Sequence, residues 1–137
     1  MSGANFIDTN IWVYAHLDAP ADERSSKAWD FTQQCQNRVI SAQVCAEYFN
    51  TMRRNGEDEA TIGRNIERML QRCRVQSMDS TTIRRTQHIR NRYGFSIWDS
   101  QVAAAALQAG CTTLYSEDMQ HGQWVESLVI INPLLVG

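Results

Sequence analysis

The chain has 137 residues, a length that suits one domain with a single hydrophobic core, and we expect one domain over residues 1–137. Hydrophobic residues make up 43% of the chain and charged residues 20%, which is typical of a globular protein and excludes a disordered one. A formal net charge of −2 excludes binding of nucleic acid through bulk charge alone, and no segment approaches the roughly 20 apolar residues that a membrane span needs.

Short apolar runs of strand length alternate with segments of helical period along the whole chain. The predicted strands are residues 4–8, 38–42, 75–78, 112–116 and 128–132. The predicted helices are residues 11–17, 21–35, 43–54, 59–73, 80–92 and 97–110. This alternation predicts an α/β protein, with a parallel sheet of about five strands and helices on both of its faces.

The first predicted strand ends at Asp8, and polar Thr9 and Asn10 follow before apolar residues resume. A strand-end aspartate can cap the next helix, because its carboxylate accepts hydrogen bonds from the unpaired N–H groups of the first turn. The other interpretation is a functional carboxylate, since open α/β sheets place their sites at the carboxyl ends of the strands. The functional interpretation requires further acids at the same edge.

Glu47 is the second candidate acid. It lies in the second turn of the helix over residues 43–54, at the border of that helix's apolar stripe, which consists of Val44, Cys45, Tyr48, Phe49 and Met52. A carboxylate beside buried residues calls for a partner. Glu47 could also be a partly exposed residue without a role in a site, and both interpretations remain open.

The helix over residues 59–73 has its predicted inward face at Ile62, Ile66, Met69, Leu70 and Cys73. Arg64, Arg68 and Arg72 recur at helical spacing on another face. Nearby acids balance this charge, so the pattern favours a solvated helix face. Some of these arginines could instead steer a polyanion, because arginine suits phosphate.

Asp99 is the third candidate acid. It opens an apolar helical face that continues through Val102, Ala103 and Ala106 in the alanine-rich helix that Gly110 closes. Ser96 and Asp99 have the spacing of a capping box, which is the local alternative. A capping acid need not stand at the head of a buried face, so the position favours a site.

The fourth candidate acid follows the strand over residues 112–116, in the segment "LYSEDMQHG". Ser116 is placed to orient the neighbouring acids Glu117 and Asp118, of which one is expected to face the site. His121 lies in the same loop, where a surface position is expected. The four acids would then meet at one edge of the sheet, where their mutual repulsion calls for a cation such as Mg²⁺ or Mn²⁺.

The sequence lacks the residue patterns of other kinds of catalytic site. None of the four cysteines forms a C-x-x-C pair, which argues against a zinc site, and no serine, cysteine or histidine triad has suitable neighbours. The segment "MSGANFIDTN" has no feature of a signal peptide, so we expect a soluble cytoplasmic protein. A carboxylate site for a divalent ion can support in-line displacement at a phosphodiester.

The ordered motifs resemble the PIN-domain ribonuclease family, which includes VapC-type toxins. The motifs on which the resemblance rests are "FIDTNIWVYA", "ISAQVCAEYFN", "YGFSIWDSQVAAAALQAGCTTLYSEDMQHG" and "VIINPL", and the resemblance covers nearly the whole chain. The resemblance implies a three-layer α/β/α sandwich and Mg²⁺- or Mn²⁺-dependent cleavage of RNA. It assigns the catalytic, metal-binding acids to Asp8, Glu47, Asp99 and Asp118, with Asn10 and Ser116 in support.

The resemblance also implies partners. Toxins of this type form homodimers, and an antitoxin protein inserts a segment near the acids. The rival interpretation is a catalytically weak module that keeps the fold and binds RNA or a protein.

Overall fold

The computed structural model describes residues 3–17, 19 and 21–135. Twelve elements follow one another along the described chain: β1 (Ala4–Ile7), α1 (Thr9–His16), α2 (Glu23–Gln34), β2 (Arg38–Ser41), α3 (Ala42–Arg54), α4 (Glu59–Arg72), β3 (Arg74–Gln76), α5 (Ser80–Tyr93), α6 (Ile97–Gln108), β4 (Cys111–Tyr115), β5 (Trp124–Val125) and β6 (Leu128–Ile131). Each predicted element is present, with bounds that differ by at most a few residues.

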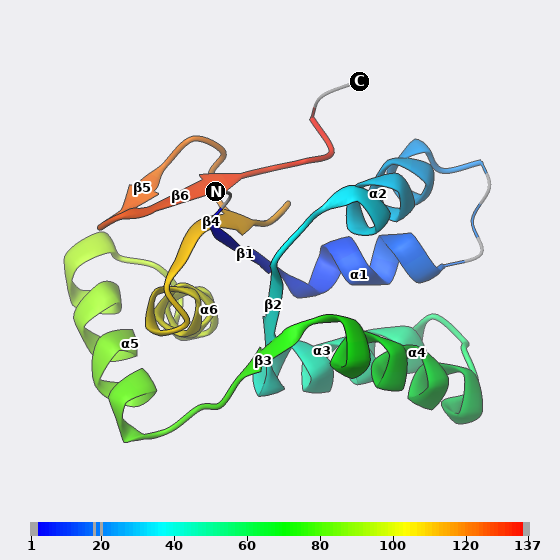
Figure 1. Ribbon diagram of the computed structural model, residues 1–137, viewed down its shortest axis with the longest axis horizontal. Coiled ribbons are helices and arrows are strands. Elements are labelled where there is room, and N and C mark those ends of the chain that lie inside the picture. Colours follow the sequence, from blue (N-terminus) through cyan, green and yellow to red (C-terminus); the bar gives the residue numbers. More distant parts are fainter. Residues whose placement is uncertain (1–2, 18, 20, 136–137) are drawn as a thin grey trace.

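The strands form one sheet in the order β3-β2-β1-β4-β6-β5, and every pairing except that of β5 with β6 is parallel. Helices α1 to α4 lie on one side of the sheet, and α5 and α6 lie on the other (Figure 1). The predicted α/β/α architecture with a central parallel sheet is therefore confirmed. The chain leaves β1 toward β2 and returns to β4 on the other flank, so the strand order reverses between β1 and β4.

Strand β5 is the element that the sequence did not indicate. It has two residues, runs antiparallel to β6, and brings the sheet to six strands. The turn between β5 and β6 contains Glu126, whose φ is +54°. Glycine or asparagine usually occupies such a position and marks the hairpin in a sequence, and here neither is present.

The core forms where both sides of the sheet meet their helices. Phe6, Ile40, Leu114 and Ile130 from four strands are fully buried. Helix α6 buries the run 103–106, in which all four residues are alanines with no exposed surface. Alanine lets a helix approach the sheet closely. Gly110 follows the helix at a φ of +76°, as expected of a C′ glycine.

Helix α4 departs from its predicted inward face at one residue. Ile62, Met69 and Cys73 are buried, whereas Leu70 is 40% exposed, so its predicted burial is wrong. The buried residues follow a single i, i+7, i+11 row, and Leu70 lies outside that row. The four cysteines are free thiols. Within the described residues, no helix is both long enough and apolar enough to cross a membrane.

Candidate active site

Asp8 lies where β1 ends and α1 begins, directly at the point of strand-order reversal. Its Oδ1 accepts the Thr9 N–H at 2.8 Å, so Asp8 is the N-cap of α1. Its Oδ2 accepts the hydroxyl of Ser116, which follows β4, at 2.9 Å. The local and the functional interpretations are therefore compatible, because one oxygen caps the helix while the whole carboxylate stands at the sheet edge.

Asp8 is an unusual cap because it is only 6% exposed. The pKa of its carboxyl is raised from 3.8 to about 7, chiefly by burial and also by the negative charges of Asp118 and Glu47, while the hydrogen bonds from Thr9 and Ser116 oppose the rise. A buried carboxylate beside other carboxylates favours its protonated form unless a cation is near. The environment of Asp8 is thus suited to a positively charged ligand.

Glu47 reaches the same place from the second turn of α3. Its Oε1 accepts the Thr9 hydroxyl at 3.3 Å and the side-chain amide of Gln43 at 3.2 Å. Glu47 therefore has the partners that its position at the border of the apolar stripe called for. Thr9 donates hydrogen bonds to two acids, from its backbone N–H to Asp8 and from its hydroxyl to Glu47.

Asp99 lies in the first turn of α6. Ser96 caps this helix, with its hydroxyl oxygen accepting the Asp99 N–H at 3.1 Å. Burial raises the pKa of the Asp99 carboxyl, the nearby charge of Asp118 raises it further, and a hydrogen bond from Ser96 opposes the rise. The Asp99 backbone completes the cap, and the carboxyl, which has a hydrogen bond from Ser96, keeps further acceptor capacity for the site.

Asp118, rather than Glu117, faces the other acids. The side-chain amide of Asn10, on α1, donates to Asp118 Oδ2 at 2.5 Å. Glu117 turns toward α2, where its Oε1 lies 3.5 Å from a guanidinium nitrogen of Arg24. His121 accepts the Asn132 N–H at its Nδ1 at 3.0 Å, so it fixes the loop before β5.

All four acids line one cavity of about 220 Å³, which we call the acid cavity. Its wall comprises Asp8, Thr9, Asn10, Gln43, Glu47, Thr51, Arg54, Trp98, Asp99, Val102 and Asp118. Ser116 stands behind this wall, fully buried, and holds Asp8. The structure thus brings together the acids of four separate segments, as the sequence predicted.

The donor chemistry of the acid cavity fits a divalent ion. Among the described residues, no three acidic, histidine or cysteine side chains are already grouped as the ligands of one ion. Mg²⁺ does not require such a group, because it usually keeps several waters and binds through one or two carboxylates. The mutual repulsion of Asp8, Glu47, Asp99 and Asp118 is the second argument for a cation.

Sequence reasoning missed several residues of the cavity wall, notably Gln43, Thr51, Arg54 and Trp98. One signal was available for Gln43, which precedes Glu47 by one helical turn and therefore lies on the same face of α3. Trp98 is adjacent to Asp99, but nothing in the sequence around it indicates that the tryptophan side chain is exposed. Only the polar contacts between Gln43 of α3 and the start of α6 bring it to the cavity.

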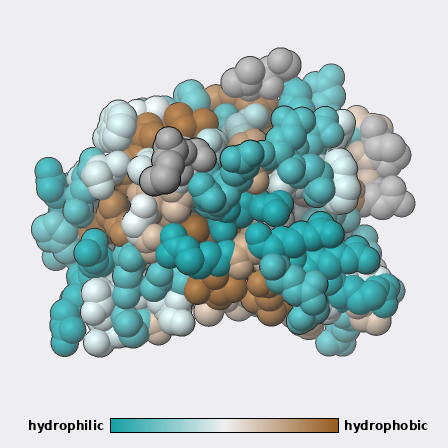
Figure 2. All heavy atoms as spheres, in the orientation of Figure 1, coloured by the Kyte–Doolittle hydropathy of each residue, from teal (hydrophilic) through white to brown (hydrophobic). Residues whose placement is uncertain are grey.

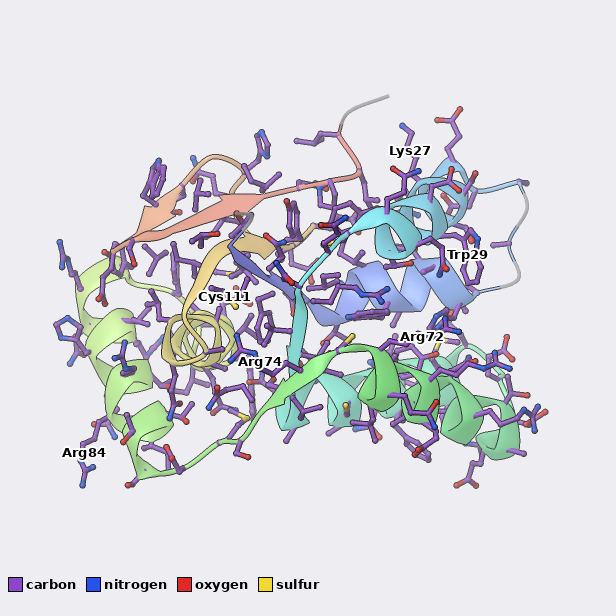
Figure 3. All side chains as sticks on the ribbon, in the orientation of Figure 1. Lys27, Trp29, Arg72, Arg74, Arg84 and Cys111 are labelled. Carbon is purple, nitrogen blue, oxygen red and sulfur yellow. The ribbon has the colours of Figure 1, made fainter. Side chains whose placement is uncertain are left out.

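The arginine stripe of α4 is divided between two environments. Arg64 is exposed and donates to the Thr61 hydroxyl at 3.2 Å. Arg68 and Arg72 instead line a second cavity of about 410 Å³, together with Trp12, His16, Trp29, Gln33, Arg38, Asn65 and Met69. We call it the arginine cavity. Trp29 and Arg72 come from the facing helices α2 and α4 (Figure 3), over which hydrophilic residues gather in Figure 2.

Comparisons with known proteins agree on the fold. The PIN domain family model matches residues 6–123. No curated protein matches. Among solved structures, VapC20 of Mycobacterium tuberculosis, a sarcin-ricin loop cleaving toxin, has a TM-score of 0.68 and 18% identity over 82% of this chain and 88% of that chain. A toxin–antitoxin complex from Klebsiella pneumoniae has a TM-score of 0.69 and 13% identity over 95% and 98%. VapBC2 from Rickettsia felis, bound to a promoter DNA fragment, has a TM-score of 0.64 and 16% identity over 93% of this chain and 96% of that chain.

Proposed function

Because the chain belongs to the PIN domain family, we propose that it is a metal-dependent ribonuclease that hydrolyses RNA phosphodiester bonds. The observation that carries the proposal is the acid cavity, in which Asp8, Glu47, Asp99 and Asp118 meet at the point of strand-order reversal. The charges of Glu47 and Asp118 raise the pKa of Asp8, and that of Asp118 raises the pKa of Asp99, so the ionised acids repel one another in the folded protein. They suit chemistry in which positive charge is supplied by a bound ion.

In this proposal the four acids hold Mg²⁺ or Mn²⁺. When bound, the ion would lower the pKa of an attacking water and neutralise charge on the phosphate. The protein's own contribution is positioning: Ser116 holds Asp8, Asn10 holds Asp118, and Thr9 with Gln43 holds Glu47. These supporting side chains fix the carboxylates before the substrate arrives, which reduces the reorganisation needed during reaction.

We propose further that the protein is the toxin of a toxin–antitoxin pair, that it acts in the cytoplasm as a homodimer, and that an antitoxin protein is its partner. This rests on solved structures of the same fold that are toxin–antitoxin complexes. Expression of the chain alone should arrest growth, and co-expression of the product of a neighbouring small reading frame should relieve the arrest. Unimpaired growth on expression of folded protein would contradict the toxin role.

Cleavage itself is tested with purified protein and a mixture of structured and unstructured RNAs. Breakdown is expected with Mg²⁺ or Mn²⁺ and not with EDTA. RNA that is bound but stays intact under all metal conditions would contradict the nuclease and favour a binding module of the same fold.

A further inference from the structure

The wall of the acid cavity contains a tryptophan that the fold does not bury. Trp98 lies in the first turn of α6, next to Asp99, and is 61% exposed. Burial of a large aromatic side chain stabilises a protein, and the exposed ring of Trp98 makes no such contribution. An aromatic ring at such a place offers a flat surface on which a nucleobase can stack.

The position of Trp98 is fixed by polar contacts with α3. The side-chain amide of Gln43 donates to the Trp98 carbonyl at 3.4 Å and to Glu47 at 3.2 Å. Gln101, one turn further along α6, donates to the Gln43 side-chain oxygen at 2.8 Å. Gln43 therefore positions both Glu47, a proposed metal ligand, and the backbone of Trp98, so the positions of Glu47 and Trp98 are coupled.

Arginines provide the second, independent observation. Arg54 lines the acid cavity and also an adjoining cavity of about 420 Å³ along α3, formed by Glu47, Asn50, Thr51, Arg53 and Arg54. Arg54 donates to the Thr51 hydroxyl at 3.3 Å, and Arg53 donates to the Glu57 carbonyl at 3.1 Å. Within the described residues neither guanidinium forms an ion pair with a carboxylate, so both keep their charge for an external anion.

These features together describe a nucleotide subsite. We infer that Trp98 and Arg54 bind a nucleotide that flanks the scissile phosphate of single-stranded RNA. Trp98 stacks the base, and Arg54, assisted by Arg53, contacts a phosphate in the adjoining cavity. The inference rests on the proposed nuclease function and specifies its substrate as a strand whose base is free to leave its neighbours, since a base inside a duplex cannot stack on a side chain.

The chain offers a matched control for the tryptophan. Trp124 on β5 is 60% exposed and does not line the acid cavity. Replacing either tryptophan with alanine removes a similar exposed surface, so a difference between the two variants reports on position. Arg64→Gln is the corresponding control for Arg54→Gln, because Arg64 lies on α4 outside both cavities of α3.

Binding is measured with a fluorescent single-stranded RNA in EDTA, and cleavage with the same RNA in Mn²⁺. For Trp98→Ala we expect affinity and kcat/KM to fall about tenfold, with partial recovery in Trp98→Phe and no change in Trp124→Ala. For Arg54→Gln we expect the salt dependence of binding to become shallower by about one unit of slope. Stabilisation of the protein by Mn²⁺ should be unchanged in Trp98→Ala, since the acids remain.

The outcomes separate the two proposals. Equal binding and cleavage by Trp98→Ala and Trp124→Ala, in a protein that does cut RNA, would overturn the subsite and leave the nuclease intact. A wild-type protein that binds RNA through Trp98 but never cuts it would support the subsite and overturn the nuclease. Tighter binding of duplex than of single-stranded RNA would also overturn the subsite.

Discussion

The acid cavity and the arginine cavity both use helix α1, yet their charges are opposite. Asp8 and Asn10, at the start of α1, line the acid cavity, and Trp12 and His16, further along the helix, line the arginine cavity with Arg38, Arg68 and Arg72. Burial and Arg68 lower the pKa of His16 to about 4, whereas burial raises that of Asp8 to about 7. In each cavity the protein favours the neutral form of a group that like charges surround. One short helix therefore separates two electrostatic environments.

The largest effect is expected from removing the charge of one carboxylate in the acid cavity. Asp8→Asn should lower metal-dependent RNA cleavage about 1000-fold, because stabilisation by a bound ion amounts to several kcal/mol. Asp99→Asn should behave alike, and the double variant should lose little more than either single one, since groups that act as a unit are not additive. Initial rates with a defined RNA measure all three.

Asp58→Asn is the control for this prediction. Asp58 caps α4 by accepting the Thr61 N–H at 2.7 Å and lies outside the acid cavity. Asparagine caps a helix about as well as aspartate, so Asp58→Asn should fold and cleave normally. Near-normal cleavage by Asp8→Asn would return Asp8 to the role of a cap.

The second prediction concerns the stability of the metal-free protein against pH. Folded Asp8 has a pKa of about 7 and the unfolded residue 3.8, so the folded state holds the extra proton between these values. The free energy of unfolding should therefore fall as pH rises through this interval, by about 4 kcal/mol from Asp8. Asp8→Asn should abolish this fall in denaturation curves measured in EDTA, and an unaltered pH profile would contradict the shift.

The arginine cavity should respond with the opposite sign. The pKa of folded His16 is about 4 and that of the unfolded residue 6.5, so the unfolded state holds the extra proton in between. Stability from His16 is present above pH 6.5 and is lost as pH falls toward 4. His16→Gln should flatten the acidic side of the same denaturation profiles. A wild-type profile in the variant would show that His16 titrates as an exposed histidine.

A divalent ion should stabilise the protein through the acid cavity and not through the arginine cavity. An ion that binds only the folded acid cavity stabilises the protein by about 2.7 kcal/mol at a concentration of one hundred times its dissociation constant. Melting temperatures should rise with Mg²⁺ or Mn²⁺, and the rise should vanish in Asp8→Asn but persist in His16→Gln. Unchanged melting of the parent protein with millimolar metal would argue against the site.

The smallest effect is expected at the arginines of α4. Changing Arg64, Arg68 and Arg72 together to Gln should leave RNA cleavage and its salt dependence nearly unchanged, because none of the three lines the acid cavity. A loss of RNA affinity with a shallower salt slope in the folded variant would mean that the arginine cavity also tracks phosphates.

The sequence predicted the parallel sheet because five of its six strands lie in short apolar runs, and it predicted where Asp8, Asp99 and Asp118 lie because they follow a strand or open a helix. Glu47 was indicated instead by its place at the border of an apolar stripe. It could not assign the roles of Glu117 and Asp118 from local pattern. That choice depends on Arg24 and Asn10, which lie on helices far from both in the chain. The arginine cavity was hidden for the same reason: Arg68 and Arg72 share the surface pattern of Arg64, and only the tertiary structure shows that they line a cavity together with residues of α1 and α2.

The contact between Asp8 and Ser116 has a consequence for synthesis of the protein. The two residues are 108 positions apart, and β1 lies between β2 and β4 in the sheet. Pairing of such distant strands is slow, because a long loop must close before any contact stabilises it. A growing chain exposes Asp8 outside the ribosome early, but Ser116 and Asp118 emerge only after every helix has been made. The acid cavity, and with it the proposed nuclease activity, can therefore be complete only after Asp118 has been made.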